Sequence, residues 1–271
     1  METLSDKLGK ELLEKIGFNV LKIPETNLKK EADFICSYKN ITILIECKLK
    51  IDDKEVVEKK DAELFSKGIS IVEGKEGYIL KYKSIIRNAS KQMKSSSITR
   101  EFNFLLFIST GINSMLKTQN IKSTLYGSIN LFRPRKDKIS NELLTCYNYT
   151  FSEFKNYNNI DACLIITEAE LNKNTFMFEL CLNHFSEKFG ILSSSNVLEL
   201  FPKVINPIQE ELDGFAYIVD DNINKKLSDF HKISPMYNPI ICHLKEKYNM
   251  EQMELLIPLN FNRPEITVIN K

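Results

Sequence analysis

The chain has 271 residues, of which 43% are hydrophobic, so it is long enough to bury one large core or two small ones. Its 37 lysines and arginines nearly balance its 36 acidic residues, which excludes a general attraction to polyanions and leaves only local segregation of charge. The longest apolar cluster, Phe104–Ile108, is far too short to cross a membrane, and no apolar leader segment begins the sequence. We therefore expect a soluble, cytoplasmic protein without a membrane partner.

The cysteines and histidines show no pattern typical of metal or redox sites. The six cysteines are scattered singly, without a C-x-x-C pair, and the three histidines lack metal-ligand spacing. The sequence thus favours neither a zinc site, nor an iron–sulfur cluster, nor a disulfide framework. We expect most of these cysteines to be small core residues.

The first part of the chain predicts a helix followed by a strand. Apolar residues recur at helical spacing over Leu4–Ile16, and Gly17 suits the end of that helix. Phe18–Ile23 predicts a strand, which Pro24 stops. Asp6 lies in the first turn of the helix, where a carboxylate complements the helix dipole.

The stretch 32–49 predicts a β-hairpin that turns at residues 39–40. Side chains alternate along its second strand, which places Glu46 and Lys48 on one face. Pairing through the turn brings Asp33 opposite Glu46, so two carboxylates and an ammonium group converge on strands of the core. Charged groups there are costly unless they have a partner or a task. The structural alternative is a salt-bridged face of an amphipathic hairpin.

A charged insertion and a basic helix are predicted next. Residues 51–77 mix acids with lysines and carry a partial helical stripe. Tyr78–Arg100 contains no acid, and its apolar residues recur at helical spacing, which suits binding to a phosphate backbone; a solvated helix face is the alternative. Its basic residues are Lys81, Lys83, Arg87, Lys91, Lys94 and Arg100. Phe102–Ser109 then predicts a strand buried on both faces.

The remaining sequence is less regular. Ala162–Thr167 and Leu212–Val219 predict strands, and Phe176–Phe189 predicts a helix. Asp161 and Asp213 lie at the beginning of the two predicted strands, but no E-x-K tripeptide follows either one. We therefore expect both acids to be structural.

Asp33 and the tripeptide Glu46-Cys47-Lys48 resemble the signature of the PD-(D/E)XK nuclease superfamily, with Ala32 where that signature often has proline. The predicted order of helix, three strands, helix and strand over Met1–Thr110 resembles the αβββαβ core of its restriction-endonuclease-like fold. The phrase LLEKIGFNV is similar to the first helix and strand of Mrr-like and resolvase-like members.

The resemblance implies an α/β fold with a mixed central sheet flanked by helices. Residues 1–112 would form the nuclease core, interrupted by the charged insertion 51–77. Residues 113–271 would form a C-terminal α/β elaboration, either as an extension of the core or as a second subdomain.

The resemblance also implies a metal site. Asp33, Glu46 and the backbone carbonyl of Cys47 would bind Mg²⁺, for which Mn²⁺ can substitute, because hard oxygen ligands suit this ion. Lys48 would orient the attacking water and stabilise the transition state. Gln92 falls where several members place a supporting lysine or glutamine on a helix.

Further residues are implied around this site. Members of the superfamily often carry an acid on the first helix, for which Asp6 is the better match and Glu2 the alternative. The polar loop before the first aspartate lies close to the substrate in these proteins, so Lys29 and Lys30 would contact phosphate, or else be solvated.

The function implied is metal-dependent hydrolysis of phosphodiester bonds in DNA, in bacterial restriction or phage defence. Such an endonuclease would act as a homodimer or with a partner subunit. The alternatives are a catalytically silent nucleic-acid-binding or assembly subunit that retains the fold, and a scaffold protein that does not bind nucleic acid.

Overall fold

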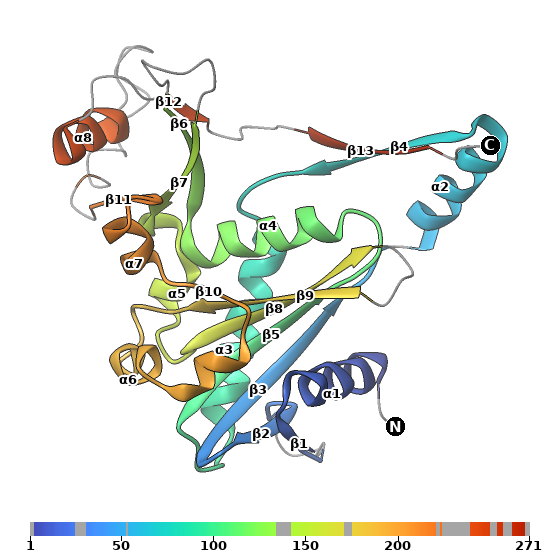
Figure 1. The fold of residues 1–271 in the computed structure, drawn as a ribbon. Coiled ribbons are helices and arrows are strands. Elements are labelled where there is room, and N and C mark those ends of the chain that lie inside the picture. The colour runs from blue at the N-terminus through green and yellow to red at the C-terminus, as the bar shows by residue number, and fades with distance from the viewer. Residues whose placement is uncertain are drawn as a thin grey trace.

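A mixed seven-stranded sheet with helices on both faces forms the centre of the computed structural model (Figure 1). A four-stranded sheet and a two-stranded sheet lie outside it. The structure describes residues 3–24, 31–52, 54–133, 142–170, 175–220, 223, 239–249, 254–256 and 262–268. Within these ranges, no helix is both long and apolar enough to cross a membrane.

The strands of the central sheet follow the order β1-β2-β3-β5-β8-β9-β10. The first three are antiparallel neighbours, β3, β5 and β8 are parallel, β9 is antiparallel to β8, and β10 is parallel to β9. Their bounds are β1 Asn19–Lys22, β2 Phe34–Tyr38, β3 Ile41–Lys50, β5 Phe102–Ser109, β8 Ala162–Glu170, β9 Thr175–Leu182 and β10 Lys203–Ile205. The predicted order of helix, three strands, helix and strand is therefore present, with an insertion between β3 and the second of these helices.

The predicted hairpin is confirmed as β2 and β3. Tyr38 pairs with Ile41 across the turn, and Lys39 has a φ of 51°, as a tight hairpin turn requires. The two faces of β3 pack into different cores: Ile43 is buried on one side of the sheet and Leu44 on the other. The alternation read from the sequence therefore predicts the orientation of this strand.

Helices cover both faces of the sheet. Helix α1 (Leu4–Ile16) packs on the face that carries Ile43, while α3 (Leu80–Ser95) and α4 (Ser114–Tyr126) pack on the opposite face. Strand β5 lies between these layers and is buried at every position, as its apolar sequence predicts. A capping box between Thr3 and Asp6 starts α1, and Gly17 ends it with a left-handed φ of 115°.

The charged insertion forms an arm that extends from the sheet (Figure 1). It consists of α2 (Lys54–Lys67) and β4 (Ile69–Lys75), and β4 pairs antiparallel with β13 (Asn262–Val268) near the end of the chain. The sequence predicts the helical part of this insertion but not its strand, because the partner strand lies far away in sequence.

The C-terminal part of the chain contributes both to the central sheet and to the four-stranded sheet, ordered β11-β7-β6-β12. Strands β8, β9 and β10 extend the central sheet beyond residue 112. The four-stranded sheet has its own apolar cluster around Leu131 and Leu244. The other elements are β6 Ser128–Arg133, β7 Glu142–Asn148, η1 Tyr149–Phe151, α5 Glu153–Asn156, α6 Phe189–Ser193, η2 Asn196–Leu200, α7 Pro207–Leu212, β11 Ala216–Val219, α8 Pro239–Tyr248 and β12 Glu254–Leu256.

The helix predicted at Phe176–Phe189 is wrong. The first half of this segment is strand β9, which pairs with β8 on one side and β10 on the other. Its side chains alternate between the two cores: Cys181 lies on the side of α4, and Leu180 and Leu182 lie on the side of α1. Apolar residues lie on both faces of β9, which removes the polar alternation that would have indicated a strand.

Candidate active site

Asp33 lies directly before β2 and is fixed against β3 by the backbone. Its N–H donates to the carbonyl of Ile45 (3.0 Å), and the N–H of Cys47 donates to Asp33 Oδ2 (2.8 Å). The predicted position of this carboxylate, opposite Glu46, is therefore confirmed. Asp33 is held by two main-chain contacts, which orient it before any ligand binds.

Glu46 is fully buried, yet only one of its carboxylate oxygens is hydrogen-bonded. Oε1 is paired with the ammonium of Lys48, whereas Oε2 has no hydrogen-bond partner among the described residues. Burial, followed by the nearby charge of Asp33, raises the pKa of Glu46 to about 7, although Lys48 acts in the opposite direction. A buried, unpaired carboxylate oxygen is costly, and a bound cation would satisfy it.

A second cation, Lys22 at the end of β1, joins two of the acids. Its Nζ lies 2.7 Å from Asp6 Oδ1 and 3.3 Å from Asp33 Oδ1. Burial alone would raise the pKa of Asp6, but the hydrogen bonds from Lys22 and Thr3 outweigh it and lower this pKa. Asp6 is therefore both a capping acid of α1 and a member of the cluster.

The sequence interpretation missed Lys22, although a signal was available. It is a lysine at the end of a strand that lies beside the one bearing the first aspartate. The pairing of β1 with β2, in which Lys22 is opposite Phe34, is needed to show that the end of β1 lies beside the beginning of β2, where Asp33 is located.

These residues surround a cavity of about 590 Å³ at the edge of the sheet. Its lining includes Asp6, Lys22, Glu31, Asp33, Lys48 and Gln92. Gln92 reaches it from α3, and its side-chain amide donates to the carbonyl of Glu31 (3.4 Å). The structure thus brings together the predicted residues Asp6, Asp33, Lys48 and Gln92, whereas Glu46 is fully buried and does not line this cavity.

The predicted basic residues around α3 divide into two groups. Lys81, Arg87, Lys91 and Lys94 are exposed on the helix. Lys83 pairs with Glu153 at 3.4 Å. Arg100 donates to the carbonyls of Met93 and Ser96, both at 2.9 Å, near the end of the helix.

This geometry shows what Arg100 contacts within the protein, and its role as a nucleic-acid contact stays a prediction. Its guanidinium satisfies carbonyls that the end of α3 leaves without helical partners, which is a structural role. Lys29, Lys30 and Glu2 lie outside the described residues.

Lys50 is a further lysine that the sequence interpretation missed. It follows Glu46 and Lys48 on the same face of β3, where it is half-buried. Burial, together with the nearby charges of Lys81 and Lys48, lowers its pKa to about 8. The alternation of β3 predicts its face, but its proximity to Lys81 depends on how α3 packs.

The two other acids considered from sequence have structural environments. Asp161 accepts hydrogen bonds from the N–H of Asn103 (2.7 Å) and from the Ser186 hydroxyl. Asp213 ends α7 and accepts from the side chain of Gln209 (2.8 Å). The expectation that both are structural therefore agrees with their contacts, although Asp213 ends a helix and does not begin a strand.

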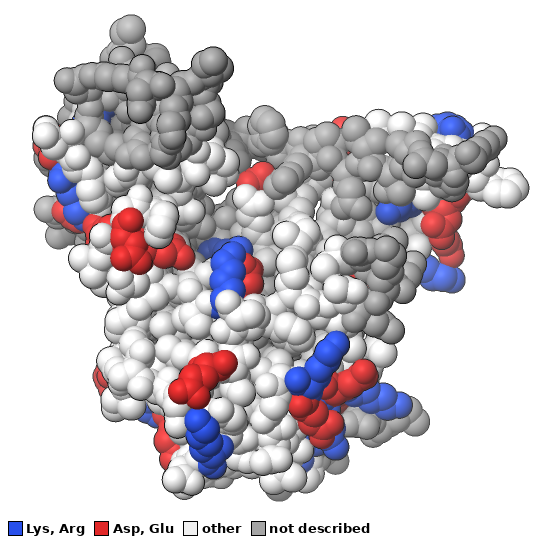
Figure 2. Space-filling model, viewed as in Figure 1, with Lys and Arg blue, Asp and Glu red and all other residues white. Residues whose placement is uncertain are grey.

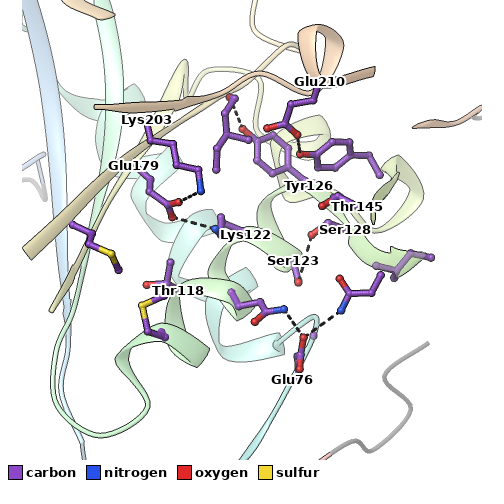
Figure 3. A pocket seen from close by; sticks show the side chains of 18 of the residues that line it. Glu76, Thr118, Lys122, Ser123, Tyr126, Ser128, Thr145, Glu179, Lys203 and Glu210 are labelled. Atoms are coloured by element: carbon purple, nitrogen blue, oxygen red, sulfur yellow. Dashed lines mark hydrogen bonds and ion pairs between the residues drawn. The ribbon is translucent and has the colours of Figure 1, made fainter. Parts of the chain in front are cut away.

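A larger cavity of about 740 Å³ lies between α4, strands β9 and β10, and the four-stranded sheet. Figure 3 shows Lys122 and Lys203 both directed at Glu179, with Nζ–carboxylate distances of 3.1 and 2.5 Å. Glu210 accepts from the Tyr147 hydroxyl at 2.5 Å. These groups are satisfied by one another, so this cavity gives a weaker indication of chemistry than the smaller one, despite its size.

The charges on the molecular surface are mixed. The face in Figure 2 shows lysines, arginines and acids in small groups of both signs, without a broad patch of one sign. This agrees with a net charge of +1 and leaves local clusters as the places where an anion could bind.

Comparison with known proteins gives no independent assignment: no protein family matches the chain, and no curated protein or solved structure shows significant similarity to it.

Two carboxylates, those of Asp33 and Glu46, could together hold a divalent metal ion. Among the described residues, no group of three or more His, Cys, Asp and Glu side chains is arranged to hold a metal. Asp33 and Glu46 are adjacent across the hairpin, and the free oxygen of Glu46 is the kind of hard ligand that Mg²⁺ prefers. The rest of the coordination shell would then be main-chain oxygen, substrate and water.

Proposed function

We propose that this chain is a metal-dependent endonuclease of the PD-(D/E)XK type, with a restriction-endonuclease-like core, that hydrolyses phosphodiester bonds in DNA. The observation that carries the proposal is the buried Oε2 of Glu46, which has no partner among the described residues, whereas Oε1 of the same carboxylate is paired with Lys48. A salt-bridged hairpin face needs no such oxygen, because it would leave both carboxylate oxygens paired or solvated. A metal site does need it.

In this proposal, Asp33, Glu46 and the main-chain carbonyl of Cys47 hold Mg²⁺ or Mn²⁺. When bound, the ion supplies Lewis-acid stabilisation of charge on the phosphate and a lowered pKa for water. The N–H of Cys47 keeps Asp33 oriented toward the site (2.8 Å), so the carboxylate is positioned before substrate arrives. The thiol of Cys47 packs under α1 and has no part in the reaction.

Lys48 has the central role among the cations. Its ammonium is paired with Glu46 and lines the cavity, so it can orient an attacking water and stabilise charge that develops on the phosphate. Gln92 and Asp6 support the site from α3 and α1. Lys22 forms ion pairs with both Asp6 and Asp33, and its hydrogen bond helps to lower the pKa of Asp6.

A role in bacterial restriction or phage defence, as a homodimer or with a partner subunit, follows from the resemblance alone. A catalytically silent binding or assembly subunit is the competing function. The two differ in whether the ion-paired Lys48 is used in turnover.

The test incubates purified protein with plasmid, single-stranded DNA and RNA in Mg²⁺, Mn²⁺ or EDTA. The Glu46→Ala/Lys48→Ala variant is compared with Glu199→Gln, which removes an exposed acid that is paired with the exposed Lys39. We expect divalent-dependent cleavage of DNA by the wild type and by Glu199→Gln, but not by the double variant. Equal cleavage by the double variant would overturn the site, and binding without cleavage would favour the silent subunit.

A further inference from the structure

Three lysines lie close together at the carboxyl end of β3. Lys48 and Lys50 alternate onto the same face of the strand, about 6.6 Å apart along it. Helix α3 packs on that face and brings Lys81, in its first turn, close enough for its charge to act on Lys50. The three ammonium groups belong to two elements that are adjacent only in the folded chain.

Lys48 is paired with Glu46, but the other two lysines of this cluster lack the acids that accompany other partly buried lysines. Lys22 is paired with Asp6 and Asp33, and Lys117 with Asp52. By contrast, neither Lys50 nor Lys81 forms an ion pair with any described carboxylate, and the charges that act on Lys50 are those of lysines alone. The charge of half-buried Lys50 is repelled by the charges of Lys48 and of exposed Lys81, so the folded protein bears a cost that a bound anion would remove.

A second unpaired group lies beside Lys50. In the parallel pairing of β3 with β5, Lys50 is opposite Ser109, on the same face of the sheet. The Ser109 hydroxyl is fully buried and has no hydrogen-bond partner among the described residues. An ammonium and a hydroxyl that both lack partners are the donors that bind phosphate oxygens in proteins.

We propose that Lys50 and Lys81 form a phosphate-binding site beside Asp33, Glu46 and Lys48, which holds a phosphodiester next to the one to be cleaved. The identity of the ligand as nucleic acid rests on the proposed function, whereas the anion site itself does not. Lys50 is thus a positioning residue: it fixes the strand so that the neighbouring phosphate reaches Lys48.

The first experiment measures binding of a 20-base-pair duplex in EDTA, where cleavage is absent. Lys50→Met keeps the apolar stem and removes the charge, and Lys15→Met, at the exposed end of α1, is the matched control. We expect about tenfold weaker binding for Lys50→Met, and a slope of log affinity against log salt that is smaller by about 0.9. Lys50→Arg should restore both values. Unchanged affinity and slope in Lys50→Met would overturn the proposal.

A second measurement uses protons and separates the site from general electrostatics. In the protein without DNA, the pKa of Lys50 is about 8, and DNA phosphates do not titrate near this pH. Because a bound phosphate favours the charged ammonium, Lys50 should take up as much as about half a proton when DNA binds at pH 8. Calorimetry in two buffers of different ionisation enthalpy measures this uptake. It should vanish in Lys50→Met but persist in Lys15→Met. Equal uptake in both variants would assign the proton to another group and contradict the site.

The source of the anion is tested with sulfate, which also does not titrate near pH 8. If the site is a general anion site, sulfate should raise the melting temperature of the wild type but not that of Lys50→Met. Stabilisation by duplex but not by sulfate would limit the site to nucleic acid, and stabilisation by neither would overturn it. If DNA binding depends on Lys50 but no cleavage occurs, the phosphate-binding site is supported and the proposed nuclease activity is contradicted. If cleavage occurs and does not depend on Lys50, the nuclease activity is supported and the phosphate-binding site is contradicted.

Discussion

Glu46 shows at the level of one residue how the proposed function conflicts with stability. Its carboxylate is fully buried, lies beside another carboxylate and leaves one oxygen without a described partner. Such an arrangement destabilises the protein unless a cation is present. It would be unusual on a strand whose only task is to build a core.

This conflict predicts that Glu46→Gln is more stable than the wild type in EDTA at pH 8. The pKa of Glu46 is raised from 4.5 to about 7, so the folded protein binds the proton more tightly than the unfolded chain does, and stability falls as pH rises through this interval. Removing the charge should raise the free energy of unfolding by about 1–3 kcal/mol at pH 8, and by little below pH 4.5. Denaturant titrations at both pH values measure it. Lower stability of Glu46→Gln at pH 8 would show that the carboxylate is well compensated.

Lys22 gives a second prediction at this scale. Lys22→Met removes the cation between Asp6 and Asp33 and leaves the buried Asp6 charge without it, so we expect a loss of about 2 kcal/mol. Adding Asp6→Asn should recover part of this loss, because it removes the stranded charge. Chemical denaturation of both variants tests the coupling. Additive losses in the double variant would mean that the two residues do not act as a pair.

At the level of elements, the position of α1 against β3 depends on a glycine. Gly9 lies in the middle of α1, where a Cβ would come within 2.9 Å of Cys47 Sγ and 3.3 Å of the Phe34 ring. The helix can therefore approach the strand that carries Glu46 only because this position lacks a side chain. The close approach also keeps the beginning of α1, with Asp6, at the edge of the cavity.

We therefore expect Gly9→Ala to destabilise the protein by about 1–3 kcal/mol, although alanine is the better helix former. The same change in a Cys47→Ala background should have a much smaller effect, because the sulfur that blocks the new methyl group is absent. Thermal denaturation of the wild type, of Gly9→Ala, of Cys47→Ala and of the double variant measures this difference. Equal losses in both backgrounds would place the clash elsewhere.

At the level of the whole molecule, strands from the C-terminal part of the chain pair with strands from its N-terminal part. Strands β8, β9 and β10 extend the sheet that carries the candidate site, and β13 pairs with β4 along its full length. The arm formed by α2 and β4 thus depends on residues near the end of the sequence. The central sheet does not.

Truncation after residue 260 tests this division. It removes β13, the strand that β4 pairs with in the two-stranded sheet, so limited proteolysis should cut within residues 54–75 much faster than in the full chain. The main thermal transition should change little, because the central sheet keeps all its strands. Loss of that transition would mean that the arm and the sheet fold as one unit.

Local patterns in the sequence predict much of this site, and long-range packing accounts for the rest. The alternation of β3 and its tight turn are sufficient to place Asp33 opposite Glu46, and helical periodicity is sufficient to give α3 its basic surface. By contrast, Lys22 and Lys50 acquire their roles only when β1 pairs with β2 and α3 crosses the sheet. The sequence did not indicate that β9 is a strand, because apolar residues lie on both of its faces.

The most direct test of the account is the single-turnover rate of DNA cleavage in Mg²⁺ by Lys48→Met and by wild type, at equal occupancy of the best substrate. We expect a rate at least about 100-fold lower for Lys48→Met, with binding in EDTA changed by no more than a few-fold, because Lys48 acts in the transition state. Equal rates, or no Mg²⁺-dependent cleavage by the wild type, would contradict it.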